Sequence, residues 1–300
     1  MFILHGGTMK SINPSTYTEL GEITISTPQE VHAAVVAARQ VFYAWHSLGV
    51  EGRIRLLRAV FDDFRLHAEE LSLLESREMG MPITESLADT DGTFAYVDWY
   101  FDHAPQILAP ETTGETPTEI HQVFREPVGI VGAIIPWNFP FANVVWSSLA
   151  ALIAGNCVII KHSELCLMSA RYIADVFSRH GLPDGAVQFV YGSGDIGAAL
   201  VDEAIDMITF TGSTAVGMSL YQKAGKKGIR AVMELGGSAP GIVFPSKDVK
   251  LVAESIASQR LLNTGQCCDG LKRLIVHRSI SDVLVAELAT IFSRKKIGNA

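Results

Sequence analysis

Five short apolar runs alternate with helical patterns between residues 129 and 235, and this alternation constrains the fold more than any other feature of the sequence. The runs, at residues 129–135, 157–161, 187–191, 207–210 and 231–235, have the length and composition of buried parallel strands. Amphipathic stretches at about 141–153, 168–180, 195–202 and 213–224 separate them, and each is near the length that a right-handed crossover needs. The pattern predicts an α/β fold with a doubly wound, mostly parallel, Rossmann-like sheet and helices on both faces.

Helical patterns precede this region. Thr27 and Glu30 form a capping box with Pro28 at the first helical position, so a helix should begin there. A second long helix is expected from about residue 51 to 77, and another over residues 83–107. Around residues 120–126 apolar and polar side chains alternate, which is typical of an edge strand or one arm of a hairpin.

A second unit is expected after Gly237. Strands at 241–244 and 271–277 alternate with helices at 249–262 and 281–292. The unit has only about 63 residues (238 to 300), too few for an independent core of ordinary size. We therefore expect two domains, residues 1–237 and an incomplete second α/β domain at 238–300.

Charge and cysteine usage exclude several classes of protein. A formal charge of −8 and a pI near 5.6 disfavour a nucleic-acid partner. The four cysteines suggest neither a disulfide framework nor a zinc site, so no metal is expected and a reducing cytoplasm fits best. The apolar opening at residues 1–4 is too short for a signal peptide, and no run reaches the ~20 apolar residues of a membrane span.

The run from Asn263 to Cys268 offers a thiol on a Gly-containing bend, and Glu234 ends a predicted strand shortly before it. A reactive thiol with a separate carboxylate base would suit covalent catalysis. A buried, inert cysteine is the commoner role for a free thiol. The residues alone leave Cys267 and Cys268 as equal candidates for the nucleophile.

Two further segments follow predicted strands, at the sheet edge where doubly wound folds bind ligands. Asn138, held between Pro136 and Pro140, could donate to an oxyanion or belong to a structural turn. Lys161 and Glu164 could bind the hydroxyls of a ribose or form a solvated ion pair, whereas His162 should support its loop.

Two glycine-containing junctions complete the pattern. The segment from Gly192 to Gly197 matches the dinucleotide-binding fingerprint, although a simple tight turn accounts for it equally well. Ser213 stands where either an anion or an N-cap would fit.

Together these motifs resemble the aldehyde dehydrogenase superfamily. Five of them occur in the family's order: Pro-Trp-Asn-Phe-Pro, Lys-x-x-Glu, Phe-Thr-Gly-Ser, Glu-Leu-Gly-Gly and Gly-Gln-x-Cys. The resemblance implies Cys268 as nucleophile, Asn138 as oxyanion donor and Glu234 as general base. It further implies cofactor contacts from Ile134, Ile135, Pro136, Trp137, Lys161, Ser163, Glu164, Gly194, Phe210, Gly212, Ser213 and Leu235.

The resemblance also implies an activity: oxidation of an aldehyde to a carboxylic acid through a thiohemiacetal and a thioester on Cys268. Glu164 should favour NAD over NADP, because a carboxylate repels a 2′-phosphate. His162, the segment at residues 98–100 and the run at 263–266 look most like the succinate-semialdehyde dehydrogenase group. The arm near residues 118–128 resembles the family's oligomerisation hairpin, which implies a homo-oligomer, a dimer or a tetramer.

The chain departs from the family in length, since it ends inside the expected catalytic domain and lacks the Glu-Ile-Phe-Gly-Pro-type segment. We therefore expect these 300 residues alone to bind cofactor poorly and turn over slowly. The alternative is a catalytically impaired remnant that binds a cofactor or a partner. A thiol hydrolase is a third reading, disfavoured because no His lies in a comparable motif.

Overall fold

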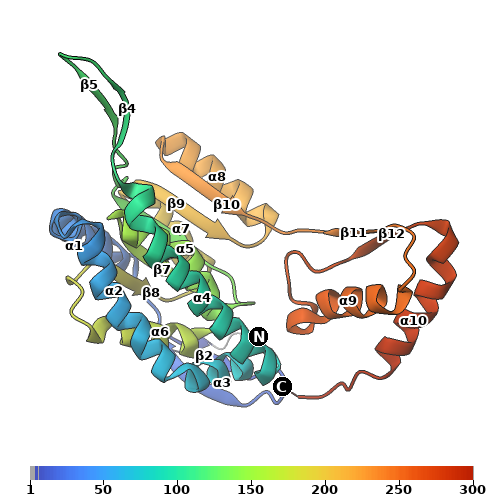
Figure 1. Cartoon of the computed structure of the whole chain (residues 1–300). Coiled ribbons are helices and arrows are strands. Elements are labelled where there is room, and N and C mark those ends of the chain that lie inside the picture. Colours follow the sequence, from blue (N-terminus) through green and yellow to red (C-terminus); the bar gives the residue numbers. More distant parts are fainter. Residues whose placement is uncertain (1–3, 6, 300) are drawn as a thin grey trace.

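The computed structural model describes residues 4–5 and 7–299 (Figure 1). Most of the apolar opening discussed above lies outside them. Ahead of the large sheet lie three strands, four helices and a hairpin: β1 (Leu4–His5), β2 (Thr8–Ile12), β3 (Glu19–Thr24), α1 (Pro28–Ser47), α2 (Gly49–Leu66), α3 (Ala68–Met79), α4 (Ile83–Leu108), β4 (Glu111–Glu115) and β5 (Ile120–Val123).

Alternating strands and helices follow, as the sequence predicts. They are β6 (Ile130–Ile134), α5 (Pro140–Ala154), β7 (Cys157–Lys161), α6 (Leu167–Arg179), β8 (Val187–Val190), α7 (Gly194–Asp202), β9 (Met207–Thr211), α8 (Thr214–Lys227) and β10 (Arg230–Glu234). The last unit holds β11 (Pro240–Val243), α9 (Val249–Leu261), the 3-10 turn η1 (Leu262–Gly265), β12 (Arg273–Val276), the 3-10 turn η2 (Arg278–Ile280) and α10 (Ser281–Ser293).

The five-stranded sheet has the order β10-β9-β6-β7-β8, and every pair in it is parallel. The chain moves outward from β6 through β7 to β8 and then returns to the other side of β6 for β9 and β10. The direction of winding therefore reverses between β6 and β9, at a point where doubly wound sheets bind ligands beyond the carboxyl ends of their strands. This topology confirms the predicted fold class.

One large apolar core joins this sheet to helices on both of its faces. Strands β6 and β7 are buried at every residue, as expected for parallel strands covered on both faces. Side chains from α1, α2, α4, α5 and α6 join the same core, and its aromatic centre comprises Phe61, Phe64, Phe141 and Phe177. The packed core on both faces thus holds the strands, and with them the carboxyl edge of the sheet, in fixed positions.

Strand β10 differs from the prediction in its burial. Residues 231–235 are expected as a buried strand, yet β10 alternates exposed and half-buried residues. Among the described residues β10 pairs only with β9, so it forms an edge of the sheet. Glu234, its last residue, is therefore exposed.

The helix expected over residues 51–77 is two helices. The chain leaves helical geometry at His67 (φ −117°, ψ 22°), which separates α2 from α3. The His67 imidazole lies 2.8 Å from the Asp63 carboxylate, one turn back. A hydrophobic pattern continues across such a break, so periodicity alone does not reveal it. The capping box of Thr27 and Glu30 is present, as the sequence predicts.

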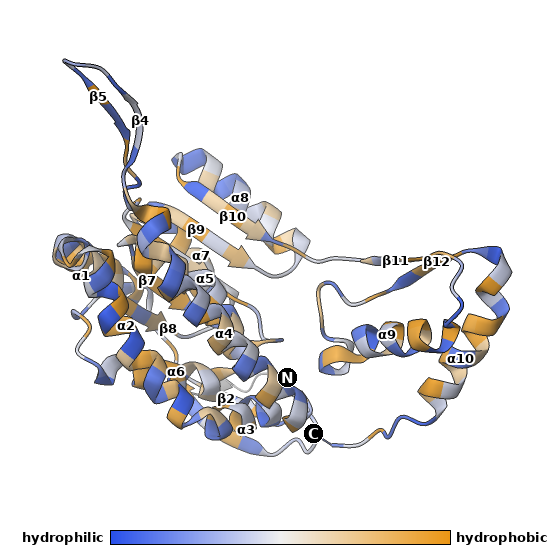
Figure 2. Cartoon of the chain, in the orientation of Figure 1, coloured by the Kyte–Doolittle hydropathy of each residue, from blue (hydrophilic) through white to orange (hydrophobic). Residues whose placement is uncertain are grey.

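The unit after Gly237 stands beside the sheet in Figure 1. Strands β11 and β12 pair in parallel, and α9 and α10 enclose a small core around Ala253, Ile256 and Leu284. Helix α10 also carries exposed apolar side chains at Val283 and Val285, and Figure 2 shows hydrophobic colouring along this helix. The domain boundary that we propose between residues 237 and 238 falls between β10 and β11.

Strands β4 and β5 form an antiparallel hairpin that projects from the body (Figure 1). Ile120, Val123 and Phe124 on this arm are exposed. None of the helices in the described part of the chain is long and apolar enough to cross a membrane.

Candidate active site

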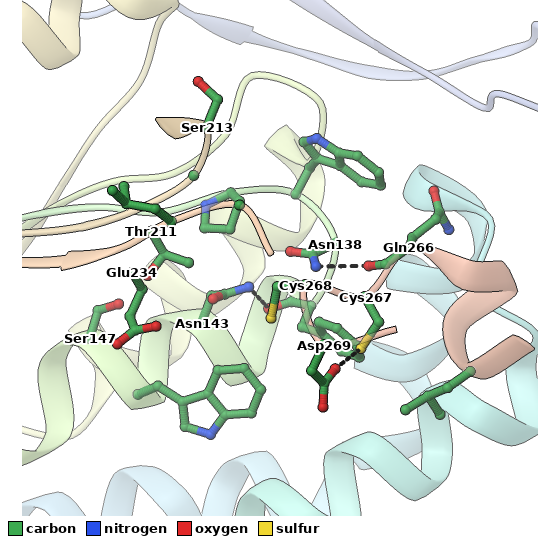
Figure 3. A pocket seen from close by; sticks show the side chains of 18 of the residues that line it. Asn138, Asn143, Ser147, Thr211, Ser213, Glu234, Gln266, Cys267, Cys268 and Asp269 are labelled. Carbon is green, nitrogen blue, oxygen red and sulfur yellow. Dashed lines mark hydrogen bonds between the residues drawn. The ribbon is translucent and has the colours of Figure 1, made fainter. Parts of the chain in front are cut away.

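A cavity of about 870 Å³ opens where the carboxyl ends of β9 and β10 meet the loop between α9 and β12 (Figure 3). The residues after β6 and the helices α4 and α5 supply the rest of its wall. Cys268, Asn138 and Glu234, which are far apart in the sequence, all line it. The structure thus brings the three predicted catalytic residues to one cavity.

The two adjacent cysteines have different environments. Cys268 is exposed, whereas Cys267 is half-buried and its thiol donates to Asp269 Oδ1 at 2.9 Å. Burial, followed by the contact with Asp269, raises the pKa of Cys267 to about 12. A thiol with such a pKa is a poor source of thiolate, so the contrast favours Cys268 as the nucleophile.

The loop before the nucleophile has an unusual backbone. Asn263, Thr264 and Gly265 lie in the left-handed region, with φ of 50°, 54° and 83°. A left-handed conformation costs a non-glycine residue roughly 1–2 kcal/mol, and it is especially unusual for a β-branched residue such as Thr264. Such strain persists only where the surrounding contacts impose it.

Asn138 faces this loop from the turn between β6 and α5. Its side-chain amide donates to the Gln266 carbonyl at 2.8 Å. An amide has two hydrogens, and the second remains to serve a ligand in the cavity. The segment at 136–140 is thus tied to the nucleophile loop, which favours an active-site role over a simple turn.

Glu234 lines the cavity from the end of β10. In Figure 3 its carboxylate points toward Ser147 and not toward Cys268. The exposed edge position of β10 gives this side chain room to turn.

The predicted cofactor residues divide into two groups. Pro136, Trp137, Gly212, Ser213 and Leu235 line the cavity together with the catalytic residues. Ser213 caps α8 by accepting from the Val216 N–H at 3.4 Å, so its N-cap role is present in the structure. The N-terminus of α8 nevertheless faces this edge, and helix N-termini attract phosphate.

The second group lies outside this cavity. Ile134, Ile135 and Phe210 are buried in the core, and a carbon added at Gly212 would come within 2.6 Å of the Phe210 ring. These three residues can offer a cofactor little beyond their backbone. Gly194 begins α7, and its neighbour Ser193 donates to Asp195 at 2.7 Å, which lowers the pKa of Asp195.

Lys161 and Glu164 form an ion pair with an N···O distance of 2.9 Å. The Lys161 side chain is only 5% exposed, so this is not the solvated surface pair considered above. Ser163 between them is buried and accepts from the Leu165 N–H. The pair stands at the carboxyl end of β7, where one ammonium and one carboxylate could bind the two hydroxyls of a ribose.

His162 supports the same loop. Its imidazole is buried and lies 3.2 Å from the Pro140 carbonyl, and burial lowers its pKa to about 4. It is therefore neutral at physiological pH and links the loop after β7 to the start of α5.

Several residues near the site were missed by sequence reasoning. Glu75 on α3 is fully buried and accepts from the Phe141 N–H at 2.6 Å, in the first turn of α5. Glu78 accepts from Met168 and Ser169 at the start of α6. The sequence does contain a pattern that marks these two residues. Leu71, Glu75 and Glu78 share one face of α3, and two acidic residues on an apolar helix face are uncommon.

Asp89 on α4 was also missed. It lines the cavity, and its Oδ2 atom is buried without a hydrogen-bond partner in the described part of the chain. Burial raises the pKa of Asp89 to about 6.

Known proteins resemble this chain along nearly its whole length. Residues 4–300 match the model of the "Aldehyde dehydrogenase family". The chain is 35% identical over 289 residues to 3,6-anhydro-alpha-L-galactose dehydrogenase of Streptomyces coelicolor, covering 96% of this chain and 58% of that protein. It is 32% identical to the mitochondrial succinate-semialdehyde dehydrogenase of Oryza sativa subsp. japonica, covering 98% of this chain and 56% of that protein.

A solved structure shows the same fold. The NAD+ complex of an aldehyde dehydrogenase from Bacillus cereus is 31% identical, with a TM-score of 0.93 over 98% of this chain and 61% of its own. The chain therefore spans somewhat more than half the length of the relatives that it matches.

Proposed function

This chain belongs to the aldehyde dehydrogenase family, and on that premise we propose that the protein carrying it oxidises an aldehyde to the carboxylic acid with NAD(P)+. The main support is the convergence of Cys268, Asn138 and Glu234 on one cavity. A nucleophile, an amide donor and a carboxylate base are the groups that acyl formation and hydrolysis need.

In the proposed first step, the Cys268 thiolate attacks the aldehyde carbon. The free hydrogen of the Asn138 amide and the N–H of Cys268 donate to the developing oxyanion. When bound, NAD(P)+ supplies the hydride acceptor, and loss of hydride leaves a thioester on Cys268.

Glu234 acts in the second step. Its carboxylate turns toward Cys268 and takes a proton from water, which attacks the thioester and releases the acid. The room around the end of β10 supports this movement, since Glu234 is exposed and ends an edge strand.

The residues present fit a dinucleotide. The buried ammonium of Lys161 and the carboxylate of Glu164 would hold the adenosine ribose, and Gly212 with Ser213 would bring the α8 N-terminus to the pyrophosphate. Trp137, in the wall of the same cavity, would contact the pyrophosphate as well, and Leu235 would enclose the nicotinamide end. Glu164 supports NAD over NADP, because its carboxylate would repel a 2′-phosphate.

Succinate semialdehyde is the substrate that the resemblance names, and we include it as the first candidate to test. The exposed apolar side chains of the β4–β5 hairpin support a homo-oligomer, either a dimer or a tetramer. A catalytic thiol supports the reducing cytoplasm as the compartment.

The test is NADH production by the protein carrying this chain, with a panel of aldehydes that includes succinate semialdehyde. Cys268→Ala should abolish turnover, whereas Cys157→Ala, deep in β7, should retain it. Turnover by the Cys268→Ala variant, or no NADH with any aldehyde, would refute the proposal.

The alternative is that these 300 residues alone form an impaired cofactor-binding or partner-binding remnant. The exposed apolar face of α10 and the open edge of β10 support it. Robust Cys268-dependent turnover by the 300-residue chain by itself would reject this alternative.

A further inference from the structure

The strained segment before the nucleophile is held by one buried side chain. Asn263 is completely buried, and it is the first of three consecutive residues in the left-handed region. Its backbone N–H donates to Glu85 Oε2 on α4 at 2.6 Å, a hydrogen bond to a charged acceptor. Glu85 therefore anchors the segment from outside the loop.

The Asn263 side chain reaches the opposite wall of the site. Its amide Nδ2 donates to the backbone carbonyl of Asn138 at 2.5 Å. Asn138 in turn donates from its own side-chain amide to the carbonyl of Gln266, two residues before Cys268. The two loops thus exchange hydrogen bonds in both directions.

Further hydrogen bonds fix the turn itself. The Gln266 N–H donates to the Asn263 carbonyl at 2.9 Å, and the Gln266 side chain donates to the Met79 carbonyl at 3.3 Å. In the part of the chain that the structure describes, the hydrogen bonds from α3 and α4 to the nucleophile loop end on Asn263 or Gln266. A shift of Asn263 would therefore move the Asn138 amide and Cys268 relative to each other.

We propose that Asn263, anchored by Glu85, is a positioning residue that sets the direction of the Asn138 amide relative to the Cys268 thiol. The proposal rests on the proposed function, in which this amide stabilises the oxyanion. Asn263 does not touch the substrate in this scheme. It acts because two loops must meet within a fraction of an ångström for the donor to reach the oxyanion.

The experiment compares Asn263→Ala with a matched control, Asn156→Ala. Asn156 is also buried, and its side chain accepts from Val128 and Gly129 and donates to Ala151. It lies at the amino ends of β6 and β7, on the opposite edge of the sheet. Both variants lose a buried asparagine with backbone partners, but only one of them faces the nucleophile.

Two rates are measured in each variant of the protein carrying this chain. One is kcat for an aldehyde that the wild type oxidises, and the other is alkylation of Cys268 by iodoacetamide, which needs the thiol but no oxyanion donor. For Asn263→Ala we expect kcat to fall about 100-fold, which is the loss of rate that a misplaced catalytic group causes. The rate of alkylation should stay within about threefold of wild type. For Asn156→Ala both rates should stay near wild type, although the Tm falls.

Glu85 gives a second test that does not remove Asn263. Glu85→Gln retains an acceptor oxygen for the Asn263 N–H and should keep most of kcat, whereas Glu85→Ala should lower it as Asn263→Ala does. Unchanged kcat in Asn263→Ala, or equal losses of kcat and alkylation, would overturn the proposal. If the wild type oxidises no aldehyde, the proposed function fails instead, so the two failures are distinguishable.

Discussion

The α-carbon of Gly237 faces the carbonyl oxygen of Cys268 so closely that a side-chain carbon at position 237 would overlap with that oxygen. Lys272 donates to the Gly237 carbonyl at 2.8 Å and strengthens the contact between the two segments. The lack of a side chain at Gly237 thus sets how near the nucleophile comes to the segment after β10.

Gly237→Ala should therefore displace Cys268. We expect kcat to fall about 10- to 100-fold, because misplacement of a catalytic group by about an ångström has effects of this size. Gly236→Ala is the matched control, since a carbon there meets nothing closer than Thr214 Oγ1 at 3.6 Å. Equal losses in the two variants, at similar Tm, would contradict this steric account.

The two adjacent thiols should differ in reactivity. With its pKa raised to about 12 by burial and Asp269, Cys267 stays protonated at pH 8. Iodoacetamide at that pH should label Cys268 first, and peptide mass spectrometry can locate the label. Cys267→Ala should leave the labelling rate of Cys268 within about threefold, since its thiol contributes no thiolate. Preferential labelling of Cys267 would reverse the assignment.

The sequence was sufficient to predict the parallel sheet, because β6 to β9 are apolar runs bounded by turn residues and crossover helices. It could not predict the exposure of β10, since an edge strand and a central strand differ in their neighbours and not in their own residues. The break at His67 was missed for a similar reason, because the apolar pattern continues through it.

The residues of the candidate site likewise fall into those that the sequence predicts and those that it does not. Cys268, Asn138 and Glu234 stand in recognisable motifs at strand ends, so their convergence on one cavity could be expected. Asn263 lies in such a motif too, but its hydrogen bonds to Asn138 and Glu85 depend on loop geometry that no spacing reveals. Glu75 carries no motif, and only its place on an apolar helix face could have marked it.

Glu75 should make stability depend on pH. Burial, followed by repulsion from Asp89, raises its pKa from the ordinary 4.5 to about 8. Between these values the folded state holds a proton that the unfolded state has lost. The free energy of unfolding should therefore fall as pH rises through this window, by up to about 1.4 kcal/mol per pH unit, and level off above it.

Glu75→Gln removes this titration while retaining an acceptor for the Phe141 N–H. Urea unfolding of wild type and variant at several pH values should give curves that diverge between about pH 4.5 and pH 8, with the variant gaining relative stability. Parallel curves over that range would mean that Glu75 is ionised in the folded protein.

Asp89 should disfavour an anionic substrate. Asp89 lines the cavity, and its buried Oδ2 atom has no hydrogen-bond partner among the described residues. Lys272, the one Lys or Arg side chain in the described lining, is already bound to the Gly237 carbonyl. Above its pKa of about 6, Asp89 is charged and repels the carboxylate of succinate semialdehyde. At pH 8, Asp89→Asn should lower the KM for succinate semialdehyde about three- to tenfold, an effect expected of one partly screened charge, and leave the KM for propionaldehyde unchanged.

Below pH 6 the KM values of wild type and variant should converge, because Asp89 is then protonated. A change of equal size for both aldehydes would show that the substitution acts through the shape of the cavity and not through its charge.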